Sequence, residues 1–201
     1  MIIYVESNFI LQLALRQEEA TSAEAILELA EKGDLELAFR AFSLSEPFST
    51  IAYRSVERKK LFNLLSEQLT QLQRSVVQQP LASNFQSLID SWRSSDAQDN
   101  DTLQVTVQRL LRAGRQIETV SQVFNQAISY QSSYGLSPQD SIIYSAVISD
   151  LQRQVVSESK CFISTNSKDF GDPGIKRELK SYNCRYISSF GDGLKFAKRG
   201  K

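Results

Sequence analysis

The sequence predicts an α/β fold with three layers, in which helices cover both faces of a mainly parallel central sheet, and with a long helical insertion. Short runs rich in β-branched and aromatic residues alternate with amphipathic helical stretches, which is the pattern of a parallel sheet. The chain has 201 residues, of which 41% are hydrophobic, so it can bury a core of its own. We therefore expect a single domain over residues 1–201.

The N-terminal part supplies the first two expected strands. Residues 2–5 are Ile-Ile-Tyr-Val, an apolar run typical of a strand buried on both faces. A short helix follows, and a second helix is expected over residues 18–32, where apolar residues share one face and Gly33 closes the pattern. Alternating apolar residues then predict a strand over residues 35–42.

A helical section is expected over residues 48–134, between the second strand and the rest of the sheet. Ser43 and Glu46 have the spacing of a capping box, which marks the start of a long helix. A second long apolar stripe predicts a helix over residues 103–128. The section is longer than a plain crossover needs, so a hairpin arm is one arrangement of its outer part. Two breaks are expected within it, at Gln78-Gln79-Pro80 and over residues 94–101.

The C-terminal part is expected to complete the sheet. Ser137 is a candidate N-cap and Pro138 suits the first helical turn, so a helix begins there. The expected order is β-α-α-β, the helical section, then α-β-α-β-α. The remaining elements are a strand at residues 160–164, a turn at 172–174, a helix at 175–182 and a strand at 184–187.

Composition excludes several classes of site. The chain has no histidine, which removes Ser-His-Asp and Cys-His catalysis and most zinc sites. Cys161 and Cys184 lie in separate apolar runs, and we expect them to be buried, reduced thiols of a cytoplasmic protein. Basic and acidic residues number 23 each, so no overall charge directs the protein to nucleic acid or membrane. No apolar stretch reaches the roughly 18 residues that cross a bilayer.

Acidic side chains follow the expected strands at one edge of the sheet. Glu6 comes directly after the first strand, and Glu46 lies in the first turn of the helix after the second. Asp140 lies in the first turn of the helix that leads to the third strand, and Asn166 and Asp169 follow that strand. Ligands bind at the carboxyl ends of parallel strands, and converging carboxylates attract a hard cation. The sequence therefore predicts a Mg²⁺ or Mn²⁺ site with oxygen ligands.

Each acid also has a structural explanation. Glu46 is explained equally well as the capping-box partner of Ser43, and Asp140 as a first-turn acid favoured by the helix dipole. Asp169 is explained as an ordinary loop acid. Glu6 is harder to explain this way, because a carboxylate directly behind a buried strand is costly unless it has partners.

The acidic motifs resemble those of the PIN-domain family, a metal-dependent ribonuclease fold found in many bacterial toxins and RNA-processing enzymes. The resemblance covers residues 1–50 and 136–190. Its four motifs are Ile3-Tyr4-Val5-Glu6-Ser7-Asn8, Leu44-Ser45-Glu46, Ser137-Pro138-Gln139-Asp140-Ser141-Ile142-Ile143-Tyr144-Ser145-Ala146 and Phe162-Ile163-Ser164-Thr165-Asn166-Ser167-Lys168-Asp169-Phe170. The family's first acid is usually aspartate, where this chain has Glu6. Its fourth motif usually begins with aspartate, where this chain has Asn166 or Ser167 and keeps Asp169.

The resemblance implies hydrolysis of RNA phosphodiester bonds at a Mg²⁺ or Mn²⁺ ion. The implied metal ligands and catalytic residues are Glu6, Glu46, Asp140 and Asp169, supported by Ser7, Thr165 and Asn166. Local positive charge for RNA is expected from Arg54, Arg58, Lys59 and Lys60 or from the C-terminal tail, although such clusters are commonly solvated surface.

Three functions stay open on the sequence. The first is an endoribonuclease, as in toxin–antitoxin systems, acting on single-stranded or looped RNA. The second is a non-catalytic PIN-like module that binds protein or RNA through its long helices. The third is a structure-specific DNA nuclease with the same metal chemistry. The expected partners are RNA, an antitoxin or other protein, and a second copy of the chain.

Overall fold

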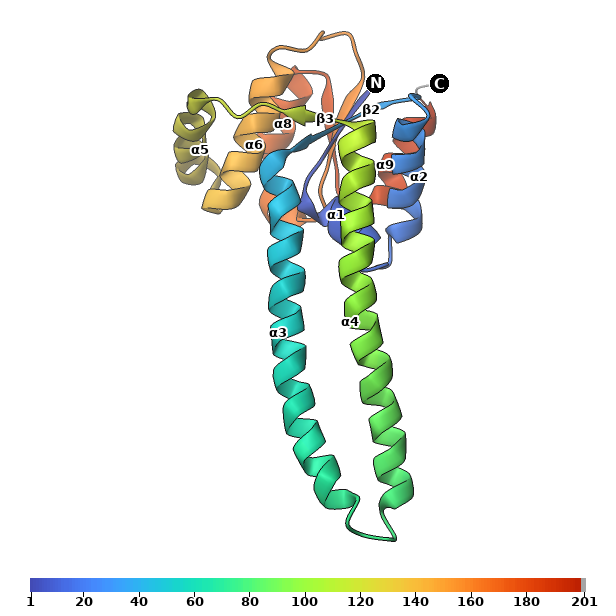
Figure 1. The fold of residues 1–201 in the computed structure, drawn as a ribbon. Coiled ribbons are helices and arrows are strands. Elements are labelled where there is room, and N and C mark those ends of the chain that lie inside the picture. Colours follow the sequence, from blue (N-terminus) through green and yellow to red (C-terminus); the bar gives the residue numbers. More distant parts are fainter. Residues whose placement is uncertain (200–201) are drawn as a thin grey trace.

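The computed structural model describes residues 1–199 and contains a five-stranded sheet with every strand parallel to its neighbours, in the order β3-β2-β1-β4-β5 (Figure 1). This confirms the predicted α/β class and the parallel sheet. The strands are β1 Ile2–Val5, β2 Glu36–Arg40, β3 Gly114–Ile117, β4 Lys160–Ile163 and β5 Cys184–Ile187.

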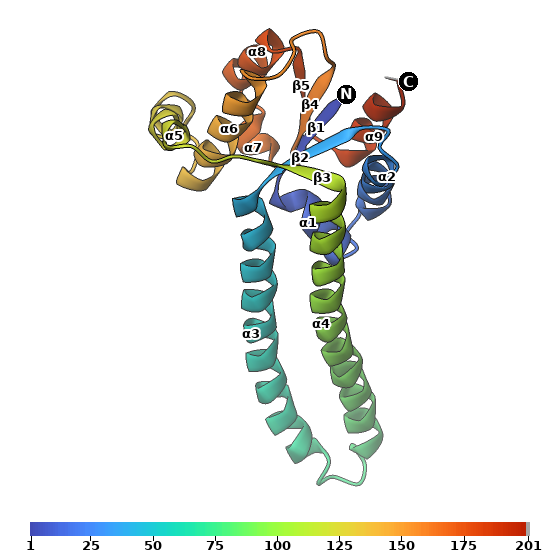
Figure 2. The same ribbon diagram turned by 45° about the horizontal axis from the view of Figure 1, so that its top comes forward.

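Strand β1 lies at the centre of the sheet, and its alternate side chains enter two separate cores. Ile3 and Val5 pack into one core, and Ile2 and Tyr4 into the other. The first core is covered by α1 Ser7–Ala14, α2 Ala20–Glu31 and α9 Phe190–Arg199. The second is covered by α5 Ser121–Tyr134, α6 Pro138–Leu151, α7 Ser167–Phe170 and α8 Pro173–Ser181 (Figure 2). Helices thus cover both faces, as the three-layer prediction requires.

The two longest helices form an arm that projects from the sheet (Figures 1 and 2). They are α3 Ala41–Leu72 and α4 Gln79–Ala113, and they run antiparallel as a hairpin. The inner end of the arm packs into the first core through Ile51, Leu103 and Val107. Among the described residues, even these helices have no apolar stretch that would let them cross a membrane.

The middle of the arm is held by an ionic layer between two apolar ones. Arg58 of α3 pairs with Asp96 at 2.7 Å and with Asp99 at 3.0 Å on α4, and Ser55 also donates to Asp96. Farther out, Phe62 packs edge-on against the Trp92 ring. A polar layer in a helix seam fixes the register of the two helices, because any shift would leave the charges unpaired.

Strand β3 contradicts the prediction of one helix over residues 103–128. The structure ends α4 at Ala113, places β3 next to β2, and starts α5 at Ser121. The strand Gly114-Arg115-Gln116-Ile117 has little apolar character, so its pairing with β2 decides its conformation against the local helical pattern. A Cβ on Gly114 would lie 2.9 Å from the Leu37 carbonyl oxygen, so this close approach requires glycine.

Other predicted boundaries in the arm are also wrong. The expected break over residues 94–101 lies inside the continuous helix α4. Pro80 does not end a helix but occupies the first turn of α4, where its missing N–H is not needed. The capping box fails because α3 begins two residues before Ser43, whose buried hydroxyl has no partner among the described residues. The inserted part is therefore the hairpin over 41–113, not 48–134.

A network around Arg115 holds β3 in the sheet. Its guanidinium donates to both oxygens of Asp150 at 2.8 Å and also pairs with Glu36 of β2. The Tyr4 hydroxyl donates to the same Asp150 at 2.8 Å. Burial pushes the pKa of Asp150 up, but the hydrogen bonds from Arg115 and Tyr4 hold it below its ordinary value.

We predict that Arg115→Gln lowers the free energy of unfolding by about 1–3 kcal/mol at neutral pH, because it leaves a buried carboxylate short of its charged partner. A carboxyl with a lowered pKa stabilises the fold above its unfolded-state pKa, and this stability is lost as the pH falls through the folded-state value. The difference from the native chain should therefore shrink below about pH 4. Urea unfolding at both pH values tests this, with the exposed Arg112→Gln as control. Equal losses for both variants would contradict it.

Candidate functional site

Glu6 is the buried centre of the acidic site. It follows β1 and is the N-cap of α1, with only 4% of its surface exposed. Its Oε2 accepts the Asn8 backbone N–H at 3.1 Å, and its Oε1 accepts the Ser164 hydroxyl at 2.9 Å. Burial raises the pKa of Glu6, the hydrogen bonds from Asn8, Ser7 and Ser164 lower it, and the charge of Glu46 raises it; the net shift is upward.

The Ser7 hydroxyl joins two acids. Its Oγ lies 2.9 Å from Oε2 of Glu6 and within hydrogen-bond distance of Oε2 of Glu46. A hydroxyl has a single hydrogen and can donate to only one of these oxygens at a time. The other carboxylate then faces a lone pair of the Ser7 oxygen, which repels it unless that carboxylate holds a proton or a cation lies nearby. The arrangement of Glu6 and Glu46 therefore favours a positive charge between the two carboxylates.

Asp140 supplies the third carboxylate, from the first turn of α6. The Ser137 hydroxyl caps the helix by accepting the Asp140 N–H at 3.1 Å, and it donates to Oδ2 at 2.6 Å. Burial raises the pKa of Asp140, and the charges of Asp169 and Glu46 raise it further, against hydrogen bonds from Ser137 and Asn166. The charges of Asp169 and Glu46 thus act on Asp140, and the charge of Glu46 acts on Glu6 as well.

These side chains share one cleft of about 270 Å³ at the carboxyl edge of the sheet. Its wall carries three carboxylates and no Lys or Arg. The lining residues are Glu6, Ser7, Asn8, Glu46, Ser137, Gln139, Asp140, Ile143 and Asn166. Five of the predicted site residues therefore come together.

Two predicted residues are placed less directly. Asp169 lies in α7 and acts on Asp140 through its charge, but neither it nor Thr165 lines the cleft. The structure adds Ser164, which the sequence analysis did not single out. The pairing of Val5 with Ile163 in neighbouring strands brings the next residues, Glu6 and Ser164, side by side. A serine directly after a buried strand was the signal for it.

The predicted basic cluster does not belong to this cleft. Arg58 is used inside the arm by Asp96 and Asp99, and Lys60 pairs with Glu57 at 2.7 Å. Arg54 starts the cluster two helical turns beyond Glu46, about 12 Å along α3. Lys59 lies on the same outer part of the arm, so none of the four lines the acidic wall.

The donor chemistry of the cleft fits a hard divalent cation, because its polar atoms are carboxylate, amide and hydroxyl oxygens. The carboxylates that line the cleft are spaced more widely than the ligands of a closed metal site. Within residues 1–199, no three Asp, Glu or Cys side chains stand close enough together to hold one ion.

Comparisons with protein-family models, with curated protein sequences and with solved structures found no match to this chain. Fold and site thus define a class, an α/β protein with an all-parallel sheet and a carboxylate-lined cleft at the carboxyl edge.

We predict that Glu6→Gln becomes more stabilising, relative to the native chain, as the pH rises. A carboxyl whose pKa is higher in the folded than in the unfolded chain costs the fold stability as the pH rises through these two values. Glutamine keeps the size and an accepting oxygen but removes this cost. Melting temperatures at about pH 4 and about pH 8 test it, with the exposed Glu67→Gln as the matched control. An equal loss of stability at both pH values would show that the Glu6 charge carries no penalty.

Proposed function

We propose that the protein is a Mg²⁺- or Mn²⁺-dependent nuclease, specifically an endoribonuclease that hydrolyses RNA phosphodiester bonds. The observation that carries the proposal is the cleft in which Glu6, Glu46 and Asp140 meet without any basic residue. Acids in such a group repel one another, and a purely structural role would not require them to gather there. The resemblance of the four sequence motifs to the PIN-domain family adds the reaction and the substrate class.

In this proposal Glu6, Glu46 and Asp140 would hold the divalent cation by closing around it from their present, wider spacing. The bound cation would activate water and neutralise charge on the phosphate. Asp140 lines the open cleft, so its carboxylate is accessible to a cation from solvent. Asn166 lines the cleft beside Asp140, and we assign it the role of orienting that carboxylate. Asp169 adds negative charge from behind, and we assign Thr165 a supporting role at the end of β4. A cytoplasmic location belongs to the same proposal, because Cys161 and Cys184 are both free thiols.

Metal binding is the first test. We predict that the native chain binds Mn²⁺ in titration calorimetry and that Asp140→Asn weakens the binding by about 10-fold or more, because one charged ligand is lost. Asp101→Asn, on the exposed surface of α4, serves as the control of equal charge change. Equal affinities for the native chain and Asp140→Asn would remove the assignment of Asp140 as a ligand.

Cleavage is the second test. Glu6→Asp draws the carboxylate back by about 1.5 Å, and we predict a loss of about 100-fold in Mn²⁺-dependent cleavage of a looped RNA. Glu6→Gln sets the background. The proposal fails if the native chain cleaves no faster than Glu6→Gln. A faster Glu6→Asp variant would show instead that the main chain at residue 6 is positioned for the shorter aspartate of the PIN-domain motif. Cleavage of a DNA flap but not of RNA would show that the substrate is DNA.

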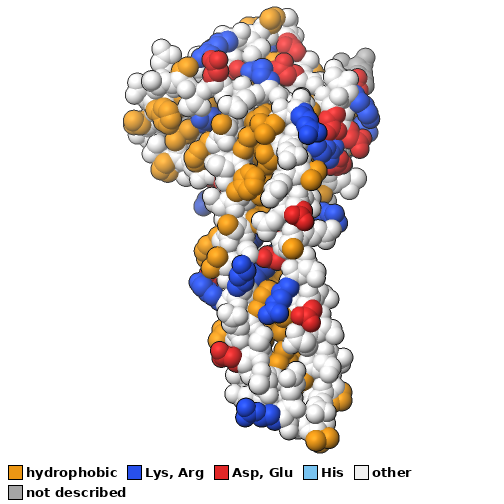
Figure 3. Space-filling model, viewed as in Figure 1, with side chains coloured by type: hydrophobic (Ala, Val, Ile, Leu, Met, Phe, Trp, Pro, Cys, Tyr) orange, Lys and Arg blue, Asp and Glu red, His pale blue; other side chains and the backbone are white. Residues whose placement is uncertain are grey.

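A second candidate function is a non-catalytic binding module that pairs through its arm with a second copy. Four apolar side chains, at steps of four, three and four residues on α4, expose 38–63% of their surface: Leu81, Phe85, Leu88 and Trp92. Figure 3 shows hydrophobic side chains exposed along the arm. Residues 61–89 contain only Glu67 and Arg74 as charged residues, so two arms would meet without net repulsion. A helix that carries exposed apolar residues in addition to those of its two-helix seam is typical of four-helix bundles.

We predict that the native chain forms dimers at raised concentration and that Leu88→Gln shifts it to the monomer, because the change removes an exposed apolar contact without altering charge. Light scattering over a concentration series measures this. Leu111→Gln, at a similarly exposed site near the base of α4, is the control. A native chain that stays monomeric throughout would exclude self-association and leave a different protein, such as an antitoxin, as the arm's partner.

A further inference from the structure

A basic groove runs along the outer edge of β5. It has a volume of about 510 Å³ and lies between α8 on one face of the sheet and α9 on the other (Figure 2). Its charged wall consists of four cations and no carboxylate: Lys160, Lys176, Lys180 and Arg185. Tyr186 and Phe196 line it as well. The sequence analysis did not single out this surface, because its cations come from three separate segments.

The three exposed cations of the groove are not neutralised within the protein. Across residues 1–199, Lys176, Lys180 and Arg185 make no ion pair. Two of them lie over aromatic rings instead. Lys176 Nζ is 5.7 Å from the centre of the Tyr186 ring, and Arg185 Cζ is 5.8 Å from that of Phe196. A ring orients a cation without cancelling its charge, so both remain available to an anion.

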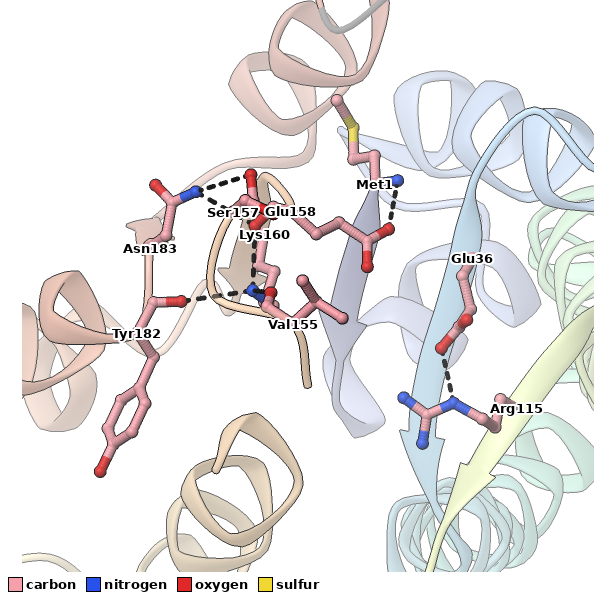
Figure 4. Close-up of polar contacts among 9 residues, drawn as sticks. All are labelled: Met1, Glu36, Arg115, Val155, Ser157, Glu158, Lys160, Tyr182 and Asn183. Carbon is pink, nitrogen blue, oxygen red and sulfur yellow. Dashed lines mark hydrogen bonds and ion pairs between the residues drawn. The ribbon is translucent and has the colours of Figure 1, made fainter. Parts of the chain in front are cut away.

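Lys160 adds a buried positive charge to the same wall. Its ammonium is held by backbone carbonyls alone, donating to Val155 at 2.6 Å, Glu158 at 2.9 Å and Tyr182 at 3.4 Å (Figure 4). The Glu158 carboxylate is turned away, towards the N-terminal ammonium of Met1 at 2.7 Å (Figure 4). The hydrogen bonds satisfy Lys160 but leave its full charge uncompensated, which strengthens the positive field of the groove.

Tyr186 connects the groove to the acidic cleft. Its ring lines the groove, and its hydroxyl donates to the Ser164 carbonyl at 2.9 Å, while the Ser164 hydroxyl donates to Glu6. Burial, and with it the charge of Glu6, raises the pKa of Tyr186 to about 12. Tyr186 thus joins one wall of the groove to Glu6 through Ser164, while Lys160 lies at the amino end of β4, towards the opposite edge of the sheet.

We propose that the β5 groove binds the phosphate backbone of a single-stranded RNA. Resting on the proposed nuclease function, the same strand would run along β5 towards its carboxyl end and from there into the acidic cleft. A cleft with three carboxylates and no cation repels a polyanion, so binding energy has to come from a neighbouring surface. The chain as a whole is neutral and supplies no steering of its own. Cations in a row beside aromatic rings are the means by which proteins hold single strands without regard to sequence.

The test measures the binding of a fluorescent single-stranded RNA to the native chain by anisotropy, in EDTA so that no cleavage occurs. The variant replaces Lys176, Lys180 and Arg185 with glutamine. We expect its affinity to fall at least 10-fold and its salt slope to decrease by about 2, at roughly 0.7 per lost phosphate contact. The control replaces Arg54, Lys59 and Lys60 with glutamine, the same charge change on the arm, and should alter affinity less than about twofold. Because all six side chains are exposed, melting temperatures should show every variant folded.

The outcomes separate the groove from the nuclease. Loss of RNA binding in the groove variant, with no cleavage by any variant, keeps the groove as an RNA site and refutes the nuclease. The proposed role of the groove is overturned if the groove variant cleaves RNA at the native rate and binds it with the native affinity. The proposal is also overturned if the native chain binds polyglutamate of matched charge as tightly as RNA, which would indicate an acidic protein as the ligand. Binding to phosphatidylserine vesicles in place of RNA would overturn it as well.

Discussion

The local structure around the site depends on one constraint, the satisfaction of a carboxylate placed directly behind the central buried strand. Glu6 is almost fully buried, so its oxygens are met by the Asn8 amide and by the hydroxyls of Ser7 and Ser164. Those partners come from the start of α1 and the end of β4. They can meet only because β1 and β4 run parallel and end at the same edge of the sheet. The same geometry brings Glu46 and Asp140 to the cleft.

Charge is separated over a short distance in this protein. The chain is neutral overall, yet the charged residues that line the cleft are all acidic and those that line the β5 groove are all basic. Two arginines elsewhere are paired internally, Arg58 with Asp96 and Asp99 in the arm seam and Arg115 with Asp150 behind β3. The three exposed cations beside β5 have no such partner among residues 1–199, and their charge is opposite to that of the cleft. In the proposed function, the groove would hold the RNA and the cleft would cut it.

The parts that the sequence predicted well are those in which local pattern and final environment agree. The runs of β1 and β4 are buried strands, β5 forms the expected edge strand with Cys184 and Ile187 buried, and the Ser137-Pro138 start of α6 stands as expected. Strand β3 escaped prediction because its polar residues gain their conformation from β2 and from the Asp150 pair with Arg115. Long-range contacts also explain the arm, where polar residues such as Asp96 look like a helix break but lie in the helix seam. Ser164 needed the strand register before its contact with Glu6 was visible.

The most direct test of the acidic site is the position of a bound ion. We suggest measuring anomalous X-ray scattering from crystals soaked in Mn²⁺, collected on both sides of the manganese absorption edge. The proposal predicts a difference peak in the cleft between α3 and α6, in contact with carboxylate oxygens of Glu46 and Asp140 and close to Glu6. A peak at another surface, or none in the cleft at saturating Mn²⁺, would contradict the assignment of these carboxylates as a metal site.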